Sequence, residues 1–311
     1  MHEERRIIEE RAGTRRPRRR VLSLTQRRGL VGWAFLSIAA FLIIWMNFYP
    51  MVRGFMIALH RGPAANMEFT GFSNFARMLE DTQFHATIRT TFLYLLVQVP
   101  IMLVLALVLA TMLNNKKLKG RGIFRTMIFL PCTVGLVAYA MVFRQMFAFD
   151  GLANTVLTNL GILSEPFNWF GEMWSSRLVV VLGLLWRWTG FNMIFYLAGL
   201  QNIDSSIYEA ARIDGAGPVR QLFSITIPLL RPIILLTAIM STNGTLQLFD
   251  ESMNLAPGLF GNASLRTMSH HIFSTAYQGR ANVGYASAMA FVVFLMVAAL
   301  ALIQMKVGDK R

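Results

Sequence analysis

Apolar blocks of membrane-crossing length dominate this sequence. An α-helix needs about 20 apolar residues to cross the hydrocarbon core of a bilayer. Six blocks of that kind occur, at residues 29–52, 90–115, 126–143, 178–203, 232–249 and 281–305. The chain is 55% hydrophobic and only 15% charged, which is outside the usual range of soluble globular domains. The sequence therefore predicts an all-α integral membrane protein with six transmembrane helices.

The strong positive charge follows the order of these blocks. The net charge is +14, and basic residues gather at 5–28, 116–125, 212–231 and 306–311. If both termini lie in the cytoplasm, these four groups all fall on the cytoplasmic side, whereas several acids lie in the opposite loops. This is the positive-inside asymmetry of membrane proteins. We therefore expect cytoplasmic termini and no nucleic-acid partner.

The order of the blocks also predicts the organisation of the chain. Residues 1–28 carry ten arginines, and we expect this tail to be disordered and to contact membrane lipid. The block at 29–52 is too long for a signal peptide and has no small-residue cleavage site, so we expect it to remain as the first transmembrane helix. Residues 53–89 are expected outside, 90–306 to form a core of five membrane helices, and 307–311 to lie in the cytoplasm.

The chain lacks the residue patterns of catalysis, metal binding and nucleotide binding. Cys132 is its single cysteine, and the sequences GxxxxGK[ST], HExxH and GxSxG do not occur. His270 and His271 are expected to be ordinary surface residues in an irregular outer loop at 251–280, and a second irregular outer loop is expected at 147–176. We expect no catalytic residue, metal or cofactor in this chain, so any ATP and Mg²⁺ would be bound by another one.

The most ordered polar segment lies between the fourth and fifth blocks, at residues 204–228. Ser206 and Glu209 have the spacing of a capping box, which marks the start of a helix. Gly215 can end that helix, and Pro218 suits the first position of the next one. The segment is therefore predicted to form a short helix, a sharp turn and a second helix.

Two interpretations of this segment remain open from spacing alone. It is either a well-capped connector or a small helix that is seated in a cleft of another protein. A helix of about two turns is marginal alone in water, so something must hold it. The residues that would allow close approach or place charges at the rim are Glu209, Ala210, Ala211, Arg212, Asp214 and Gly215.

The stretch EAARIDGAGPVRQLFSITIPLLRP, at 209–232, resembles the EAA loop of ABC importer permeases, and its IDGAG wording is most similar to the carbohydrate-uptake, maltose-type branch. FRTMIFLP at 124–131, LFDES at 248–252 and VGYASAMAFVVF at 283–294 also resemble that branch. The similarity runs from about residue 71 onward. Two departures are that NLAPGLFGN replaces the usual Gly-rich turn after LFDES, and that Phe143 stands where a Trp is common.

The resemblance implies a type I ABC importer permease fold and a subunit of a binding-protein-dependent sugar importer in the bacterial cytoplasmic membrane. It implies a second permease subunit, two copies of a cytoplasmic ABC ATPase and an external sugar-binding protein as partners. The short loop helix would then be the coupling helix that docks in the ATPase, with Glu209 making a charge-assisted contact there. The chain itself would not be an ATPase.

Polar and aromatic residues inside the fourth and fifth blocks suggest a substrate pathway. Polar groups within apolar spans usually face a bundle interior or a cavity, and sugars are bound by aromatic faces and amide or hydroxyl groups. By resemblance, the middles of these two helices touch the ligand in the maltose-type permease. The candidates are Trp188, Thr189, Asn192, Thr245 and Gln247. The alternatives are interface anchors and cross-helix hydrogen bonds. Arg187 is expected to pair with an acid on a neighbouring helix or to face water.

A stand-alone secondary transporter or channel for a small polar solute is the competing interpretation. It would need its own coupling-ion site, and many such carriers contain internal repeats. The sequence shows no such repeat, and acids inside the apolar blocks are nearly absent, with Asp250 and Glu251 at the end of a block. Transport driven by an ion gradient without ATP would favour this alternative.

Overall fold

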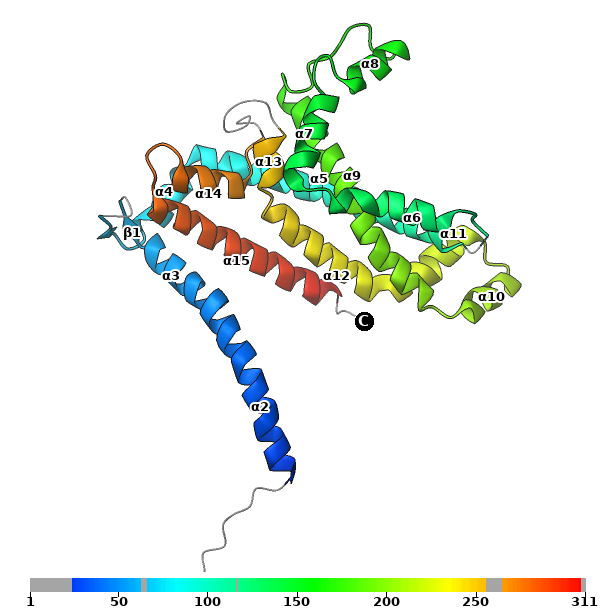
Figure 1. The fold of residues 1–311 in the computed structure, drawn as a ribbon, viewed down its shortest axis with the longest axis horizontal. Coiled ribbons are helices and arrows are strands. Elements are labelled where there is room, and N and C mark those ends of the chain that lie inside the picture. Colours follow the sequence, from blue (N-terminus) through cyan, green and yellow to red (C-terminus); the bar gives the residue numbers. More distant parts are fainter. Residues whose placement is uncertain (1–23, 63–65, 116, 256–264, 309–311) are drawn as a thin grey trace, which may run out of the picture. The chain divides into compact units, whose positions relative to one another are not determined.

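The structure, a computed structural model, describes residues 24–62, 66–115, 117–255 and 265–308 (Figure 1). Contacts divide the chain into two compact units, residues 1–53 and 54–311. The first unit contains α2 (Leu24–Ile43), the π-helical turn η1 (Ile44–Phe48) and the start of α3 (Tyr49–Ala58). Most of the predicted disordered tail lies outside the described residues, but its last five residues are helical.

The first helical segment is longer than the predicted span of 29–52. Its candidate membrane-crossing part runs over Val31–Ala58, and none of its most apolar window is buried inside the structure. The π-turn directly precedes Pro50 on α3; proline lacks an N–H and disturbs the regular hydrogen-bond ladder. The rings of Phe41, Trp45 and Tyr49 stack along one face, with centroids 6.1 and 5.2 Å apart. An exposed apolar helix of this length is suited to lipid.

The second unit is built from four long helices and one sharply bent pair. The long helices are α5 (Thr82–Asn114), α9 (Met173–Gln201), α12 (Ile227–Leu246) and α15 (Val283–Gly308). The bent pair consists of α6 (Arg121–Phe129) with the 3₁₀ turn η2 (Leu130–Thr133), followed by α7 (Leu136–Met146), and the bend is 101°. Among the described residues, five helices of the chain are long and apolar enough to cross a membrane, and the bent pair would be the sixth crossing.

The bend corrects the prediction of one continuous helix at 126–143. Pro131 lies in η2 and cannot donate a backbone hydrogen bond, and Val134 and Gly135 are extended before α7 begins. Gly190 on α9 packs directly against this break, since a Cβ placed there would overlap the carbonyl oxygen of Ile128. The broken segment therefore lies close to the backbone of α9 where only glycine leaves enough room.

Several other helix ends differ from the predicted blocks. α5 begins eight residues earlier than the block at 90–115, because Asp81 caps it by accepting hydrogen bonds from the backbone N–H groups of Gln83 (2.9 Å) and Phe84 (3.1 Å). α9 begins at Met173, and α12 ends at Leu246. Polar first turns extend α5 and α9 ahead of their apolar centres, which a count of apolar residues does not detect, whereas α12 ends three residues before its predicted block does.

The two loops that were predicted to be irregular contain helices. The first includes α8 (Leu152–Asn159), and the second includes α13 (Asp250–Asn254) and α14 (Met268–Tyr277). Asn154 is buried and organises the first loop: its amide nitrogen donates to the carbonyl oxygens of Ala148, Phe149 and Phe167, and its side-chain oxygen accepts from Phe167 N and Trp169 Nε1. The NLAPGLFGN departure falls mostly at 256–264, outside the described residues.

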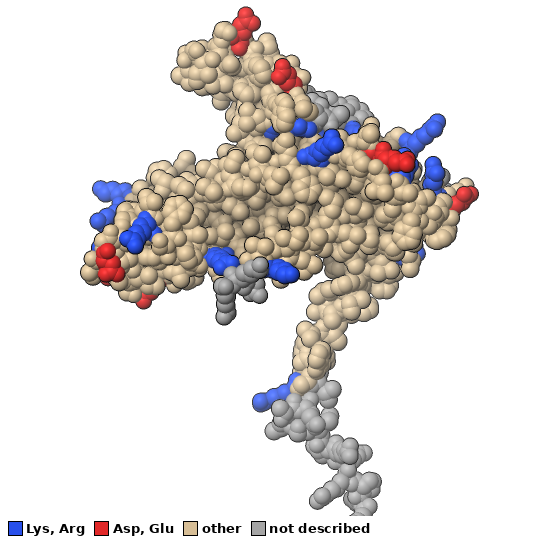
Figure 2. Space-filling view, turned by 180° about the vertical axis from the view of Figure 1, so that it is seen from behind, with Lys and Arg blue, Asp and Glu red and all other residues tan. Residues whose placement is uncertain are grey.

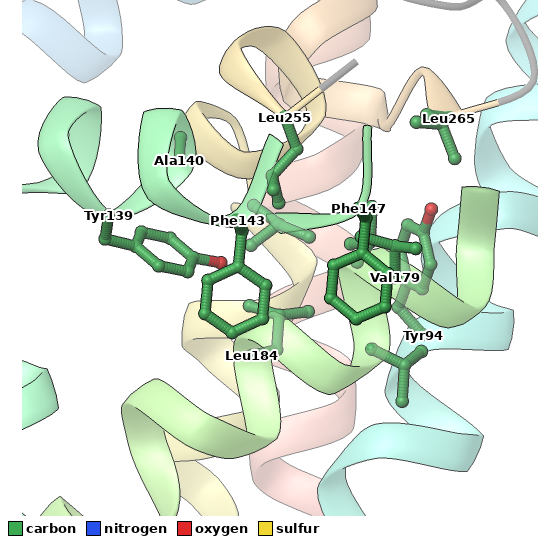
Figure 3. Packing of buried hydrophobic residues seen from close by; sticks show 12 residues of the cluster. Tyr94, Tyr139, Ala140, Phe143, Phe147, Val179, Leu184, Leu255 and Leu265 are labelled. Carbon is green, nitrogen blue, oxygen red and sulfur yellow. The ribbon is translucent and has the colours of Figure 1, made fainter. Parts of the chain in front are cut away.

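Aromatic side chains of α7 form much of the largest buried cluster (Figure 3). Tyr139 and Phe143 of α7 and Phe147, the residue directly after this helix, lie in a row, with neighbouring ring centroids 5.3 and 6.1 Å apart. They pack with Val179 and Leu184 of α9. The bent segment is thereby attached to α9 by apolar burial as well as by the close approach at Gly190.

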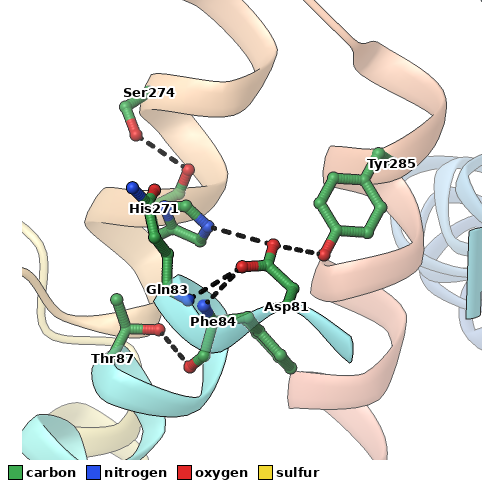
Figure 4. Close-up of polar contacts among 7 residues, drawn as sticks. All are labelled: Asp81, Gln83, Phe84, Thr87, His271, Ser274 and Tyr285. Carbon is green, nitrogen blue, oxygen red and sulfur yellow. Dashed lines mark hydrogen bonds and ion pairs between the residues drawn. The ribbon is translucent and has the colours of Figure 1, made fainter. Parts of the chain in front are cut away.

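A polar network connects α5, α14 and α15 at one end of the unit (Figure 4). The second carboxylate oxygen of Asp81 accepts a hydrogen bond from the Tyr285 hydroxyl (2.6 Å) and lies 3.9 Å from His271 Nε2. His270 donates or accepts at Ser252 Oγ (2.8 Å). His270 and His271 are 0% and 5% exposed, so the prediction of ordinary surface residues was wrong. The mixture of polar and apolar residues in α14 did not indicate that other helices pack against both sides of this short helix.

Burial controls the protonation of this network. Burial alone would raise the pKa of Asp81, but the hydrogen bonds from Tyr285 and the two backbone N–H groups, with nearby His271, bring that pKa below its usual value. Burial lowers the pKa of His271, although Asp81 opposes that change. Burial, together with Arg266 and His271, lowers the pKa of His270 to about 4. Both histidines are therefore neutral near pH 7.

One short helix and two short strands also belong to the second unit. α4 (Ser73–Glu80) precedes α5, and β1 (His60–Arg61) pairs antiparallel with β2 (Glu68–Phe69). They occupy the segment 53–89 that was predicted to be external. On the face shown in Figure 2, uncharged residues cover most of the second unit, and the charged side chains stand at its ends and at a few places along its upper and lower edges. This distribution fits a body that crosses an apolar layer.

Candidate functional site

A short exposed helix joins the two central helices α9 and α12. It is α10 (Ser205–Ile213), and it is followed by α11 (Pro218–Gln221), the π-turn η3 (Leu222–Thr226) and α12. The predicted helix, turn and second helix are therefore present. The cap differs, because Asp204 rather than Ser206 accepts the capping hydrogen bond, from Ser206 N at 3.0 Å. That bond from Ser206 also lowers the pKa of Asp204.

The C-terminus of α10 explains the glycine at position 215. Ala216 N donates to Ala211 O (2.8 Å) and Gly215 N donates to Arg212 O (3.1 Å), which is the Schellman pattern. Gly215 has φ = 77°, a left-handed conformation that disfavours residues with a Cβ. A side chain at Gly215 would meet nothing within 4 Å in the chain itself. The position is strained for other residues, but it is open toward its surroundings.

One side chain of α10, Tyr208, attaches the helix to η3, and most of its other residues are exposed. The Tyr208 and Thr226 hydroxyls are 3.0 Å apart and hydrogen-bonded, which fixes α10 to η3. Ile213 is 87% exposed, and Glu209, Arg212 and Asp214 are exposed as well. Ala210 is exposed and Ala211 is half-buried. Small residues, charges and an exposed isoleucine thus share one short and rigid helix.

A cavity of about 330 Å³ lies in the second unit between α5, α9, α12 and α13. Four of the five predicted pathway residues line it, namely Trp188, Asn192, Thr245 and Gln247. Thr189 is buried but is not one of the lining residues, because it follows Trp188 on the helix and projects from a different face. The pathway role of Thr189 stays a prediction.

Sequence reasoning did not select six other polar or aromatic residues of the lining, namely Gln98, Phe191, Ser241, Phe249, Asp250 and Glu251. Gln98 was detectable, since it is an isolated amide in a long apolar block, the same signal that identified Asn192. Glu251 was noticed at the end of a block, but its burial, with 3% exposure, depends on the helix α13 that the sequence did not predict.

Hydrogen bonds between helices shape the polar side of the cavity. Thr245 Oγ1 donates to Gln98 Oε1 (3.2 Å), and Ser241 Oγ donates to Asn192 Oδ1 (3.4 Å). Asn192 Nδ2 donates to Trp188 O (3.0 Å). Gln247 donates to Asn243. The alternative of cross-helix bonding therefore holds for Thr245 and Asn192, and these bonds also orient amide and hydroxyl groups beside the cavity.

Membrane-crossing helices surround a polar and aromatic cavity, and an exposed helix lies between two of them in the chain. This is the architecture of a transporter subunit. The family of binding-protein-dependent transport system inner membrane components matches residues 91–311. This chain belongs to that family. As an inner-membrane component it is the permease part of an ABC importer and not its ATPase, so the stand-alone carrier is set aside.

Curated relatives align with nearly the whole length of this chain. The lactose transport system permease protein LacF of Rhizobium radiobacter is 43% identical, covering 93% of this chain and 97% of its own length. The arabinooligosaccharides transport system permease protein AraP of Halalkalibacterium halodurans is 31% identical, covering 92% and 90%. The trehalose/maltose transport system permease protein MalF of Thermococcus litoralis is 31% identical, covering 93% and 97%.

A solved structure shows the same fold. A chain of a bacterial ABC transporter that imports the acidic polysaccharide alginate superposes with a TM-score of 0.77 at 21% identity, covering 91% of this chain and 96% of its own. The predicted type I permease fold and the family resemblance are thus confirmed. The roles of individual residues in the loop and in the cavity stay predictions.

Proposed function

We propose that this chain forms one half of the translocation pathway of an ATP-driven importer of disaccharides or short oligosaccharides. The observation that carries the proposal is that α9 and α12 both line the cavity, while the segment that joins them consists of α10, α11 and η3. Relatives named for lactose, arabinooligosaccharides and trehalose or maltose support a glycoside as substrate.

The lining of the cavity suits a sugar. Aromatic rings can cover the apolar C–H face of a pyranose, and buried amide and hydroxyl groups fix ligand orientation. Trp188 and Phe191 supply the rings, at 5.9 Å between centroids. Asn192, Thr245 and Gln247 supply polar groups. A second permease subunit would complete the pathway, and an external sugar-binding protein would deliver the substrate.

The α10 segment is proposed as the coupling helix. Two copies of a cytoplasmic ATPase would bind ATP and Mg²⁺. One of these copies would contact α10 and the turn after it, through Glu209, Ala210, Ala211, Arg212, Asp214 and Gly215. The hydrogen bond between Tyr208 and Thr226 and the Schellman motif make α10 a rigid attachment. A displacement of α10 would therefore be transmitted to α9 and α12, which contribute Trp188, Asn192, Ser241 and Thr245 to the cavity lining.

The distribution of basic residues supports the orientation of the chain. The α10 loop, the 116–125 segment and both termini carry the basic groups, which favours a cytoplasmic location for all of them. The cavity then opens toward the external side near α13, and α8, α13 and α14 face the external binding protein.

The test is transport by the intact complex. The chains that copurify with this protein in mild detergent would be identified and reconstituted in vesicles, and uptake of labelled lactose, maltose and arabinobiose measured. We expect uptake that requires ATP inside and the binding protein outside, and sugar-stimulated ATP hydrolysis. Uptake driven by a proton or sodium gradient without ATP would contradict the proposal.

A further inference from the structure

Two buried side-chain amides meet at one sulfur atom in the wall of the cavity. Gln98 Nε2 donates a hydrogen bond to Met102 Sδ (3.1 Å), and Asn192 Nδ2 donates to the same sulfur (3.5 Å). All three residues line the cavity, and none of them is more than 3% exposed. A thioether sulfur is only a weak acceptor. Two amide donors, from α5 and α9, therefore converge on a point of the cavity wall that satisfies them poorly.

Two hydroxyl groups of α12 fix the direction of these amides. Thr245 Oγ1 donates to Gln98 Oε1 (3.2 Å). Ser241 Oγ donates to Asn192 Oδ1 (3.4 Å). Because each amide oxygen is taken up by α12, each amide nitrogen faces the sulfur. Asn192 Nδ2 has a second acceptor in the Trp188 carbonyl oxygen (3.0 Å), whereas in the described part of the chain Gln98 Nε2 has the sulfur alone.

The charges around this site favour a neutral oxygen as its ligand. The charged residues among the described lining are the acids Asp250 and Glu251, which disfavour an anion. Arg187 is 6% exposed and is not a lining residue; its Nη1 donates to the carbonyl oxygen of Val134 (2.7 Å). The pairing of Arg187 with an acid that the sequence predicted is not found among the ion pairs of the described residues. The two amide donors thus suit an uncharged hydroxyl oxygen.

We propose that Gln98 and Asn192 together bind one hydroxyl group of the transported sugar, and that Met102 Sδ takes the place of that hydroxyl oxygen when no sugar is bound. Methionine is unbranched and has several rotatable bonds, and the cavity of about 330 Å³ beside it gives its side chain room to move aside. The inference rests on the proposed function and deepens it. It makes Gln98 on α5 a specificity-determining residue, which contacts the sugar through its amide nitrogen.

Replacing the sulfur has an effect that a packing role alone does not predict. Met102→Leu roughly conserves volume but removes the acceptor, so the substrate-free protein is destabilised while the sugar-bound form keeps its contacts. Met102→Leu should therefore lower the Kd for sugar by roughly three- to tenfold. Gln98→Leu removes one donor and should raise the Kd by roughly three- to tenfold. In the Gln98→Leu protein, adding Met102→Leu should lower the Kd less than it does in the wild type.

Equilibrium binding to the purified complex in mild detergent measures these changes, with radiolabelled lactose, maltose and arabinobiose as probes. Met193 supplies the matched control, because it follows Asn192 on α9, is fully buried in an apolar cluster and does not line the cavity. Met193→Leu should leave the Kd unchanged. A higher or unchanged Kd in Met102→Leu would overturn the proposal, and so would a wild-type complex that binds none of the three sugars.

Monodeoxy derivatives of the sugar that binds most tightly identify the hydroxyl group. In the wild type, the derivative that lacks this hydroxyl should bind roughly three- to tenfold more weakly than the parent sugar, and in Gln98→Leu this difference should shrink. A difference of the same size in both proteins would overturn the role of Gln98. If uptake requires ATP but the Kd values do not change as expected, the hydroxyl site fails while the proposed function stands. If the Kd values change as expected but uptake does not require ATP, the proposed function fails while the hydroxyl site stands.

Discussion

Replacing Gly190 with alanine tests how the broken helix is attached to α9. A Cβ at this position would overlap the carbonyl oxygen of Ile128, and it would lie 2.7 Å from the Ile128 carbonyl carbon and 3.0 Å from Phe129 Cα. Carbon atoms in ordinary contact are about 3.5–4.0 Å apart. All three neighbours are backbone atoms, so no side chain can rotate away, and α6 with η2 would have to move by roughly an ångström.

The cost can be estimated from general values. Overpacking of a well-packed interior costs about 1–3 kcal/mol, and occasionally more, while Gly→Ala inside a helix gains up to about 1 kcal/mol from helix propensity. Gly122 on α6 is the matched control, because a Cβ there meets nothing within 4 Å. The propensity gain is common to both variants, so we expect Gly190→Ala to be less stable than Gly122→Ala by the overpacking cost of about 1–3 kcal/mol.

Thermal unfolding of the purified protein in mild detergent measures this difference. The melting temperature of Gly190→Ala should be several degrees below that of the wild type, whereas that of Gly122→Ala should be equal or higher. Protease sensitivity should rise around 130–135 in Gly190→Ala only. Equal melting temperatures for the two variants would refute the close approach of α9 to the helix break.

Three further predictions concern other parts of the molecule. A valine at position 215 would be strained at φ = 77°, but its Cβ meets nothing within 4 Å in the chain. The Gly215→Val protein should therefore insert into the membrane normally, yet show no uptake and no sugar-stimulated ATP hydrolysis. Normal transport would contradict a coupling role for this position. Stability in detergent should fall as the pH decreases from about 6.5 toward about 4, because a histidine of the unfolded chain has a pKa of about 6.5, whereas the pKa of His270 in the folded protein is lowered to about 4. The unfolded state therefore takes up a proton first and is favoured. A wild-type melting temperature that does not change between pH 7 and 4.5, or a His270→Gln variant whose melting temperature depends on pH in the same way, would contradict this. Asn154→Ala removes five hydrogen bonds, so residues 147–170 should become sensitive to protease while the membrane helices stay intact, and unchanged digestion would argue against Asn154 as the organiser of that loop.

The sequence predicted the features that depend on local composition. Long apolar blocks predicted the membrane helices, and Gly215 and Pro218 predicted the turn after the loop helix, since each acts through its own backbone restrictions. Polar residues within apolar blocks located the cavity, because Trp188 and Asn192 lie on one face of one helix. These signals are carried by residues that are close together in the chain.

The features that the sequence did not predict depend on contacts between distant segments. The break at Pro131 is stabilised by Gly190 and Arg187 of another helix, and no local pattern reveals that packing. His270 and His271 are buried because α14 packs against α15 and α5; Asp81 lies beside His271, and Ser252 of α13 is hydrogen-bonded to His270. Glu251 is buried through the same tertiary arrangement. Burial of a polar residue is a property of the assembled fold.

Crosslinking from α10 tests the central claim most directly. In a variant in which Cys132 is replaced by serine, a cysteine at Ile213, which is 87% exposed on α10, should crosslink to a nucleotide-hydrolysing protein, with a yield that changes on adding ATP. A cysteine at Leu152 on α8, which is 63% exposed, is the matched control and should not reach that protein. An Ile213 cysteine that never crosslinks to an ATPase in the active complex would contradict the account of α10 as the point where force enters this chain.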